Sequence, residues 1–281
     1  MRCVPATVPF DLAEWLHQLH PFVQPSLRAF VTPQTQHSMS DSDEEITPFF
    51  PRIFLPGESY ALDGIAIRAQ LLGLTSGLTF ASAIALYLHD SAYHLPLFIL
   101  FLSIFHFLEF YITARYNTRR ATIGSFLFQN GREYTAAHTL AAVEYLLEYA
   151  LHTRVAAPPL PLFLTGLALI LVGQTLRSLA MIHASTSFNH HVAYRKEVDH
   201  KLITTGVYAW IRHPSYLGFW LWGLGTQVML GNPVCFVGYA AVLWRFFSRR
   251  IAFEEDYLVR FFGKRYIDYR NKTRVWIPFI P

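Results

Sequence analysis

The sequence contains few charged residues and almost no cysteine. Only 15% of its 281 residues are Asp, Glu, Lys or Arg, whereas 53% are hydrophobic. This composition excludes a disordered chain, a coiled coil and an ordinary soluble globular protein. The two cysteines, Cys3 and Cys235, provide neither a disulfide framework nor a pair of metal ligands. The formal net charge is +4 and no long run of Lys or Arg occurs, so nucleic acid is not an expected partner.

Several cofactor motifs are also missing. The sequence has no Gly-x-Gly-x-x-Gly loop and no Gly-Lys-Ser/Thr loop, which leaves a Rossmann domain or a P-loop unsupported. Membrane di-iron oxygenases carry several histidine boxes. Here the pair His190 and His191 lacks a ligand three residues earlier, where Ser187 stands, and the other histidines are scattered. We therefore expect no metal site.

Long apolar segments are what the sequence does have. A window of about 19 residues identifies six of them, at 67–88, 95–113, 134–152, 159–181, 215–231 and 233–248. The third contains Glu144 and Glu148 and the fifth is interrupted by glycines, so each of these two spans a bilayer only if its polar or small face packs on protein. The last two segments are joined by Gly231-Asn232-Pro233, a turn too short to hold anything else. We predict an all-α integral membrane protein with about six transmembrane helices, the last two forming a helical hairpin.

The basic residues predict the orientation in the membrane. Lys and Arg resist translocation and collect on the cytosolic side. If 114–133, 182–214 and 249–281 lie on one face with the N-terminus, that face or its helix ends hold all 23 Lys and Arg residues except Arg154. We therefore expect the polar segments that are available for chemistry to face the cytosol.

Two regions of different character follow from the same patterns. Residues 1–60 form an N-terminal region in which 10–31 has interfacial character and 32–51 resembles an acidic linker. Asp11 and Glu14 interrupt any apolar core of a secretory signal there. Residues 61–281 form the membrane-embedded domain, and within it 182–281 interleaves polar residues with apolar helices. We expect this last part to contain the cofactor-binding and catalytic region.

Two polar clusters in this region are brought together by the hairpin. The first is Arg212-His213-Pro214-Ser215-Tyr216, where Pro214 suits the first turn of a helix. A helix start presents N–H donors and favours an anion nearby. The second contains Arg250 and Glu254, which are four residues apart and share a helix face. Taken separately, each cluster also fits a structural role, as an interfacial turn and as a surface ion pair.

The residues from His200 to Pro281 resemble a known family. They include Gly-Val-Tyr-Ala-Trp-Ile-Arg-His-Pro-Ser-Tyr-Leu-Gly and a tail with Glu-Glu, Phe-Gly and two tyrosines. The resemblance is to the isoprenylcysteine carboxyl methyltransferase family, and it extends back to about residue 65. It implies a multi-pass enzyme of the endoplasmic reticulum membrane that uses S-adenosyl-L-methionine. The expected substrates are prenylated CaaX proteins, such as small GTPases, after proteolytic trimming, and the acceptor is the C-terminal carboxylate of a farnesylated or geranylgeranylated cysteine.

The resemblance also implies roles for individual residues. Arg250 matches the family arginine that binds the substrate carboxylate, and we take it as the catalytic and substrate-binding residue. The residues expected to contact the methyl donor are His200, Lys201, Leu202, Ile203, Tyr208, His213, Pro214, Ser215, Tyr216 and Glu254. For Glu254, either hydrogen bonds to the donor or a direct pair with Arg250 is compatible with the sequence, and the first is favoured.

Other functions remain possible at this level. A phospholipid N-methyltransferase has a similar donor site but accepts an amine, a sterol reductase has a similar hairpin but uses a nicotinamide cofactor, and a transporter or lipid-binding protein needs no reaction at all. The prenyl chain of the expected substrate partitions into lipid, so we expect an apolar tunnel that opens laterally to the bilayer. Glu144 and Glu148 share a helix face, with Arg177 as the expected counter-ion, and a role in shaping the substrate or donor pocket is the alternative.

Overall fold

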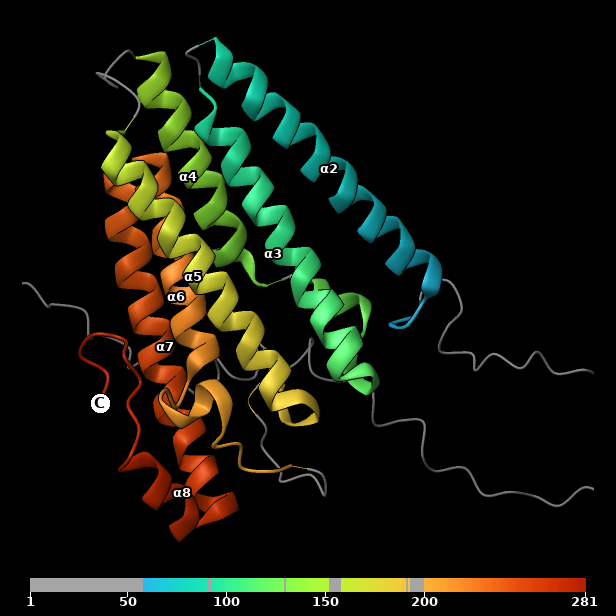
Figure 1. The fold of residues 1–281 in the computed structure, drawn as a ribbon, viewed down its shortest axis with the longest axis vertical. Helices are drawn as coiled ribbons and strands as arrows, with labels where there is room; N and C mark the ends of the chain where they lie inside the picture. Colours follow the sequence, from blue (N-terminus) through green and yellow to red (C-terminus); the bar gives the residue numbers. More distant parts are fainter. Residues whose placement is uncertain (1–57, 90–91, 129, 152–157, 191, 193–199) are drawn as a thin grey trace, which may run out of the picture. The chain divides into compact units, whose positions relative to one another are not determined.

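The computed structural model describes residues 58–89, 92–128, 130–151, 158–190, 192 and 200–281. Figure 1 shows its helices, which are α2 (Leu62–Leu88), α3 (His94–Tyr116), α4 (Arg132–Ala150), α5 (Leu160–Ala184), α6 (Pro214–Leu230), α7 (Pro233–Phe262) and α8 (Lys264–Arg270). Short 3-10 helices lie in the connections, namely η3 (Thr118–Arg120), η4 (Ile123–Phe126), η5 (Ser185–Ser187) and η6 (Gly206–Ala209). The described residues form no strand, so the predicted all-α class is confirmed. The predicted interfacial segment and acidic linker lie outside the described residues.

Within the part of the chain that the structure describes, three helices are long and apolar enough to cross a membrane by themselves. They are α2, α3 and the stretch Leu160–Ser187 that contains α5. They coincide with the first, second and fourth predicted spans. Helices α4, α6 and α7 also lie at predicted positions, but α4 carries glutamates and α6 has only 17 residues. A membrane protein is therefore confirmed, while six spans stay a prediction.

Helix α7 continues beyond the last apolar segment, as the shared helix face of Arg250 and Glu254 requires. We expected the last span to end near residue 248, and the helix continues to Phe262. No glycine or proline interrupts the chain between Tyr239 and Phe262, and the helix stops at Gly263, whose φ is 56°. The additional turns extend the helix by about 20 Å. Arg250 and Glu254 therefore stand on a rigid continuation of a membrane helix rather than on a loop.

Helices α5 and α6 approach each other at glycines. Gly166 and Gly173 on α5 face α6, and Gly218 and Gly225 on α6 face α5. A Cβ atom placed on Gly173 would lie 2.5 Å from the backbone nitrogen of Trp222 and 2.6 Å from the carbonyl oxygen of Gly218. Small residues at such positions let two membrane helices pack backbone to backbone. This contact holds the start of α6, where the polar residues lie, against the end of α5.

The predicted hairpin between α6 and α7 is present. Gly231 adopts a left-handed conformation with φ 71° at the end of α6, and Pro233 begins α7. The carboxylate of Glu144 accepts hydrogen bonds from the backbone N–H groups of Val234 and Cys235, at 2.8 and 2.7 Å. A carboxylate at this position satisfies N–H groups that the first helical turn leaves unpaired and complements the helix dipole. Glu144 thus caps α7, and our expectation that it pairs with Arg177 was wrong.

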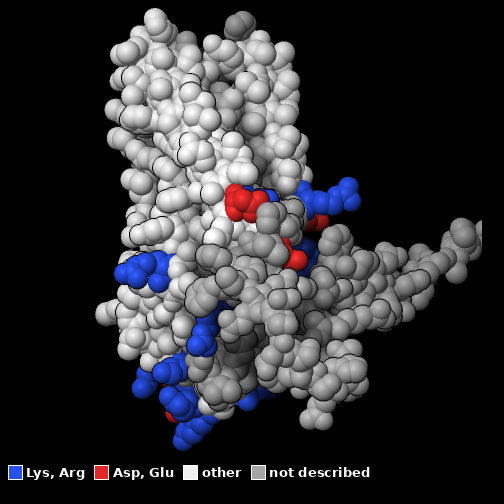
Figure 2. Space-filling model, turned by 90° about the vertical axis from the view of Figure 1, so that its right-hand side faces the viewer, with Lys and Arg blue, Asp and Glu red and all other residues white. Residues whose placement is uncertain are grey.

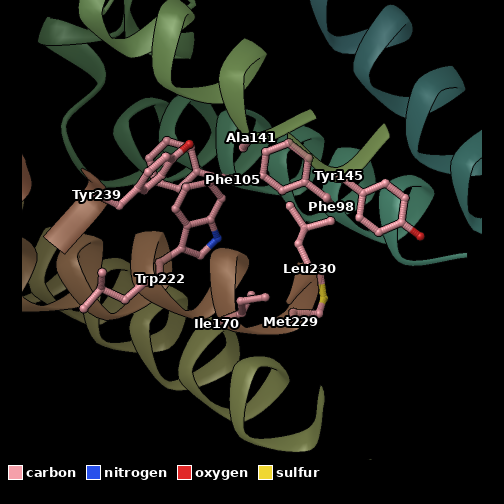
Figure 3. Close-up of a cluster of buried hydrophobic side chains, with 10 residues drawn as sticks. Phe98, Phe105, Ala141, Tyr145, Ile170, Trp222, Met229, Leu230 and Tyr239 are labelled. Atoms are coloured by element: carbon pink, nitrogen blue, oxygen red, sulfur yellow. The ribbon is translucent and has the colours of Figure 1, made fainter. Parts of the chain in front are cut away.

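A cluster of aromatic and aliphatic side chains fills the space between α3, α4, α6 and α7. Figure 3 shows Phe105 of α3 next to Trp222 of α6, whereas Phe98 of α3 lies farther along the cluster, towards Leu230 of α6. The rings of Phe105 and Trp222 have centroids 4.7 Å apart. Buried aromatic pairs at such distances contribute about 0.5–1.5 kcal/mol beyond the area they bury. This core anchors α3 and α4 to the hairpin.

The charged side chains are distributed unevenly along the helices. On the face shown in Figure 2, Lys and Arg gather towards the end that contains α8, and the opposite end shows none. This distribution agrees with the basic asymmetry that the sequence predicts. The orientation of that end towards the cytosol stays a prediction.

Candidate functional site

A cavity lies at the basic end of the helices, where α5, α6 and α7 meet α8. It contains about 690 Å³ of empty space, part of it open to solvent. We refer to it as the α6–α7 cavity. All ten residues that the family resemblance places around the methyl donor line it, namely His200, Lys201, Leu202, Ile203, Tyr208, His213, Pro214, Ser215, Tyr216 and Glu254. The structure therefore brings together residues that are up to 54 positions apart in the sequence.

The sequence analysis missed part of the wall of this cavity. Residues 187–189, which follow α5, line it, and so do Tyr266 and Tyr269 of α8. The two tyrosines are three residues apart, a spacing that places side chains on one helix face. This spacing was the available signal. Burial raises the pKa of Tyr269 to about 12, with smaller opposing effects from Thr273 and Arg212, so this hydroxyl remains a neutral hydrogen-bond donor.

Arg212 ties the start of α6 to the C-terminal tail. Its side chain is buried, and its backbone N–H donates to the carbonyl oxygen of Arg274 at 3.0 Å. The guanidinium donates to the backbone oxygens of Arg270, Thr273 and Pro281 at 3.1, 2.5 and 2.6 Å. A buried cation with this many acceptors is well compensated. Arg212 thus fixes the position of His213 and Pro214, which begin the helix at the cavity.

Glu255 completes this tie. Its carboxylate accepts from Arg212 Nε at 2.8 Å and lies 3.2 Å from His213 Nε2. Burial favours the neutral acid, but the hydrogen bond and charge of His213 and the charge of Arg212 outweigh it and lower the pKa of Glu255 to about 2. Glu255 is therefore ionised at neutral pH. It serves the architecture of the turn, whereas its neighbour Glu254 faces the cavity.

The hydroxyl of Tyr216 lies between Arg250 and Glu254. It accepts a hydrogen bond from Arg250 Nε at 2.8 Å and donates one to Glu254 Oε2 at 2.5 Å. The Arg250 guanidinium also lies over the Tyr216 ring, 5.4 Å from its centroid, and Nη2 donates to the carbonyl oxygen of His190. The sequence left open whether Arg250 and Glu254 pair directly. The tyrosine hydroxyl bridges the two side chains, so the structure links them indirectly through Tyr216.

A buried ion pair between Arg177 and Glu109 lies next to Ser215, which lines the α6–α7 cavity. Arg177 of α5 binds both carboxylate oxygens of Glu109 of α3, with Nη2 to Oε2 at 2.8 Å. Arg177 Nη1 also donates to Ser215 Oγ at 2.9 Å, and Ser215 lines the α6–α7 cavity. The structure therefore corrects the expected partner of Arg177, which is Glu109 rather than Glu144 or Glu148. Since α3 contacts α5 directly, the pair links three helices at one point.

Gly206 allows the Tyr208 segment to fold back against α5. Its φ is 61°, and a Cβ atom there would overlap the His183 ring. The neighbouring N–H of Val207 donates to His183 Nδ1 at 3.2 Å. Tyr208 then donates its hydroxyl to the carbonyl oxygen of Ala180 at 3.3 Å, and burial raises its pKa above the ordinary value. Tyr208 thus provides a neutral, fixed aromatic wall to the cavity.

Comparison with known proteins identifies the family of this chain. The profile of the isoprenylcysteine carboxyl methyltransferase family matches residues 166–260, a range that runs from Gly166 to Arg260 and includes all the predicted site residues. Protein-S-isoprenylcysteine O-methyltransferase of Saccharomyces cerevisiae is 44% identical over 230 residues, which are 78% of this chain and 92% of the yeast protein. The human protein of the same name is 40% identical over 220 residues, or 77% of this chain and 75% of the human protein. The chain belongs to the isoprenylcysteine carboxyl methyltransferase family.

A solved structure supports the membership. It is described as the eukaryotic intramembrane Ras methyltransferase, isoprenylcysteine carboxyl methyltransferase, without a monobody. It superposes with a TM-score of 0.73 at 35% sequence identity and covers 81% of this chain and 80% of that chain. The predicted family, enzyme class and membrane setting are thereby confirmed. As a member of this methyltransferase family, the protein uses a methyl donor.

Proposed function

We propose that the protein esterifies the C-terminal carboxylate of a prenylated cysteine in trimmed CaaX proteins, with S-adenosyl-L-methionine as methyl donor. The proposal places the enzyme in the endoplasmic reticulum membrane with its site facing the cytosol. The observation that carries it is the arrangement of Arg250, Tyr216 and Glu254. The Tyr216 hydroxyl at the edge of the α6–α7 cavity contacts both charged residues. Arg250 on one side can bind the acceptor carboxylate, and Glu254 on the other can bind the methyl donor.

The residues of the α6–α7 cavity fit S-adenosylmethionine. Glu254 offers a carboxylate to the ammonium or ribose hydroxyl groups, while Leu202, Ile203 and Leu258 provide apolar walls and Tyr208 an aromatic surface for the adenine. Sites for small polar ligands combine such apolar walls with a few polar groups. When bound, S-adenosylmethionine supplies a methyl group on a positively charged sulfur.

Arg250 has the geometry to bind the acceptor carboxylate. A C-terminal carboxyl has a pKa of about 3.5, so at neutral pH the nucleophile is already ionised and no general base is needed. Guanidinium binds carboxylate bidentately and stays charged. Tyr216 and the carbonyl of His190 hold two of the N–H groups of Arg250, which fixes the orientation of the guanidinium. The task of the protein is therefore the placement of the carboxylate.

The side chains that support the α6–α7 cavity next to Arg250 are shielded from water. His213, Ser215 and Arg177 are buried, and the apolar helices continue directly from them. The reaction consumes one negative and one positive charge, so a low dielectric disfavours the separated reactants more than the transition state. A site at the membrane boundary provides this condition. The prenyl chain of the acceptor enters from the bilayer, at about 0.8 kcal/mol of favourable transfer free energy per CH₂ group.

Purified protein in detergent tests the proposal with labelled S-adenosylmethionine and three acceptors. These are N-acetyl-S-farnesylcysteine, N-acetylcysteine and phosphatidylethanolamine. We expect base-labile methyl ester on the farnesylated acid alone, because only this acceptor has both the carboxylate and the apolar chain. Label on the amine lipid would indicate a phospholipid N-methyltransferase instead, and no label on any acceptor would contradict the proposal.

Glu254→Ala is expected to weaken donor binding. Loss of a charged hydrogen-bond acceptor costs about 1.5–3 kcal/mol, so the Kd for S-adenosylmethionine should rise by roughly 10- to 100-fold. Isothermal titration with the donor measures this, and Asp256→Ala on the same helical turn is the matched control. Unchanged donor affinity in Glu254→Ala would assign Glu254 to the support of Tyr216 alone.

A further inference from the structure

A second and larger cavity lies on the other side of the segment that follows α5. Its walls are the end of α3, the turns η3 and η4, and residues 186–190. It contains about 1270 Å³ of empty space, part of it open to solvent. We refer to it as the η3–η4 cavity. No residue expected to contact the methyl donor lines it.

The lining of the η3–η4 cavity combines polar, charged and apolar groups. Amide and hydroxyl side chains come from Thr113, Asn117, Thr122 and Ser125, and two arginines of η3 add positive charge. Leu127 and Phe188 are the aliphatic and phenyl side chains in its wall. Thr113, Asn117 and Ser125 already donate to backbone carbonyl oxygens. The two arginines are charged, and an isoprenoid chain would remove solvent from them at a free-energy cost. The two cationic side chains beside mixed polar and apolar surface instead fit a ligand that carries its own hydrogen-bond acceptors, as a polypeptide main chain does.

The η3–η4 cavity adjoins the reacting centre. Phe188 and Asn189 line both cavities, and the carbonyl oxygen of the next residue, His190, accepts a hydrogen bond from Arg250. The shared wall is attached to α3, because Asn117 Nδ2 donates to the carbonyl oxygen of Phe188 at 2.9 Å. A ligand whose carboxylate lies on Arg250 therefore has the η3–η4 cavity, with its two arginines, as the adjacent open space.

We propose that the η3–η4 cavity binds the polypeptide segment that immediately precedes the prenylated cysteine of the acceptor. This inference rests on the proposed function, which fixes the carboxylate on Arg250 and sends the prenyl chain into the bilayer. The third branch of the acceptor is the chain attached to the cysteine nitrogen, and it needs a polar path away from the site. At about 3.3–3.6 Å per residue, two or three residues of this chain span such a cavity.

Gly124 offers a probe of this subsite. It lines the η3–η4 cavity, and a Cβ atom there meets only the side chain of Thr122, at 3.3 Å. Its φ lies outside the left-handed region, so the backbone accepts a larger residue. Gly124→Phe therefore adds bulk at the cavity wall while the residues around Arg250 remain unchanged. Gly124→Ala is the matched control, because it adds the Cβ without the ring.

The experiment compares two acceptors, N-acetyl-S-farnesylcysteine and a farnesylated peptide with four residues before the same cysteine. For Gly124→Phe we expect kcat/KM on the short acceptor to stay within about twofold, and kcat/KM on the peptide to fall about tenfold or more through a higher KM. Gly124→Ala should behave as the wild type on both acceptors. Equal loss on both acceptors, or no loss on either, would overturn the subsite. Wild-type protein inactive on both acceptors would overturn the proposed function itself.

A length series on the unaltered protein gives an independent measurement. Farnesylated acceptors with zero to five residues before the cysteine should show a KM that falls over about the first three residues and then stays constant. This pattern is expected because later residues leave the η3–η4 cavity. A KM that does not depend on acceptor length would contradict the inference whatever the behaviour of the Gly124 variants.

Discussion

Arg250→Ala is expected to reduce methyl transfer by at least about 100-fold while the Kd for S-adenosylmethionine changes by less than about threefold. Truncation of one partner of a desolvated, hydrogen-bonded charge pair costs about 2–5 kcal/mol. The donor is affected little because Arg250 is not among the residues that line the α6–α7 cavity, and its hydrogen bond to Tyr216 links it to that lining. Single-turnover rates with a farnesylated acceptor and isothermal titration with the donor measure the two quantities separately.

Two further variants sharpen this prediction. Arg249→Ala removes the exposed neighbour of Arg250 on the same helix and should retain near-normal turnover. Arg250→Lys keeps the charge but loses the bidentate geometry and the contact with Tyr216, so we expect it to recover only a small part of the activity. Near-normal turnover in Arg250→Ala would show that another group holds the carboxylate.

The location of the site followed from the sequence because its residues are local to one architectural feature. A proline at the first turn of α6 and a three-residue turn between α6 and α7 determine a hairpin, and the hairpin places Tyr216 opposite Glu254. Both signals are short-range and depend on backbone chemistry. The family resemblance then supplied the residues of the 200–203 segment, whose approach to the hairpin no local pattern indicates.

The partners of the buried charges could not be predicted in this way. Three glutamates in other predicted spans, Glu109, Glu144 and Glu148, are possible partners of Arg177. The sequence does not show which of these helices lies against α5. The structure gives Arg177 to Glu109 because α5 contacts α3, and it gives Glu144 to the start of α7. Helix neighbours and rotations are set by packing across the whole bundle, whereas charge pairing in the sequence depends on spacing alone.

The C-terminal tail illustrates a second limit. Arg212 binds backbone oxygens of Thr273 and Pro281, about 60 to 70 residues away. A backbone carbonyl carries no mark in the sequence, so a side chain that binds carbonyls cannot be assigned a partner from residue types. The η3–η4 cavity could not be predicted either. Its walls come from segments about 60 residues apart, and no local pattern shows that these segments meet.

The contact between α5 and α6 predicts the largest effect on folding. Gly173→Leu is expected to lower the free energy of unfolding by more than about 3 kcal/mol and to prevent accumulation of folded protein. The Cβ atom alone would lie 2.5 Å from the backbone nitrogen of Trp222. Neither backbone can move away without separating the two helices. Thermal unfolding in detergent and the monodisperse fraction after size-exclusion chromatography measure the effect.

Gly77→Leu is the control for this prediction, because Gly77 of α2 has no heavy atom within 4 Å of its Cβ position and should accept leucine with little change.

Gly173→Ala distinguishes two consequences of the same contact. Arg177 lies one turn beyond Gly173 and donates to Ser215 at the start of α6, so a small separation of the helices moves Ser215 away from Arg177. We therefore expect Gly173→Ala to lose donor affinity as well as stability, since Ser215 lines the α6–α7 cavity. A wild-type melting temperature in Gly173→Leu would contradict the close approach of α5 and α6.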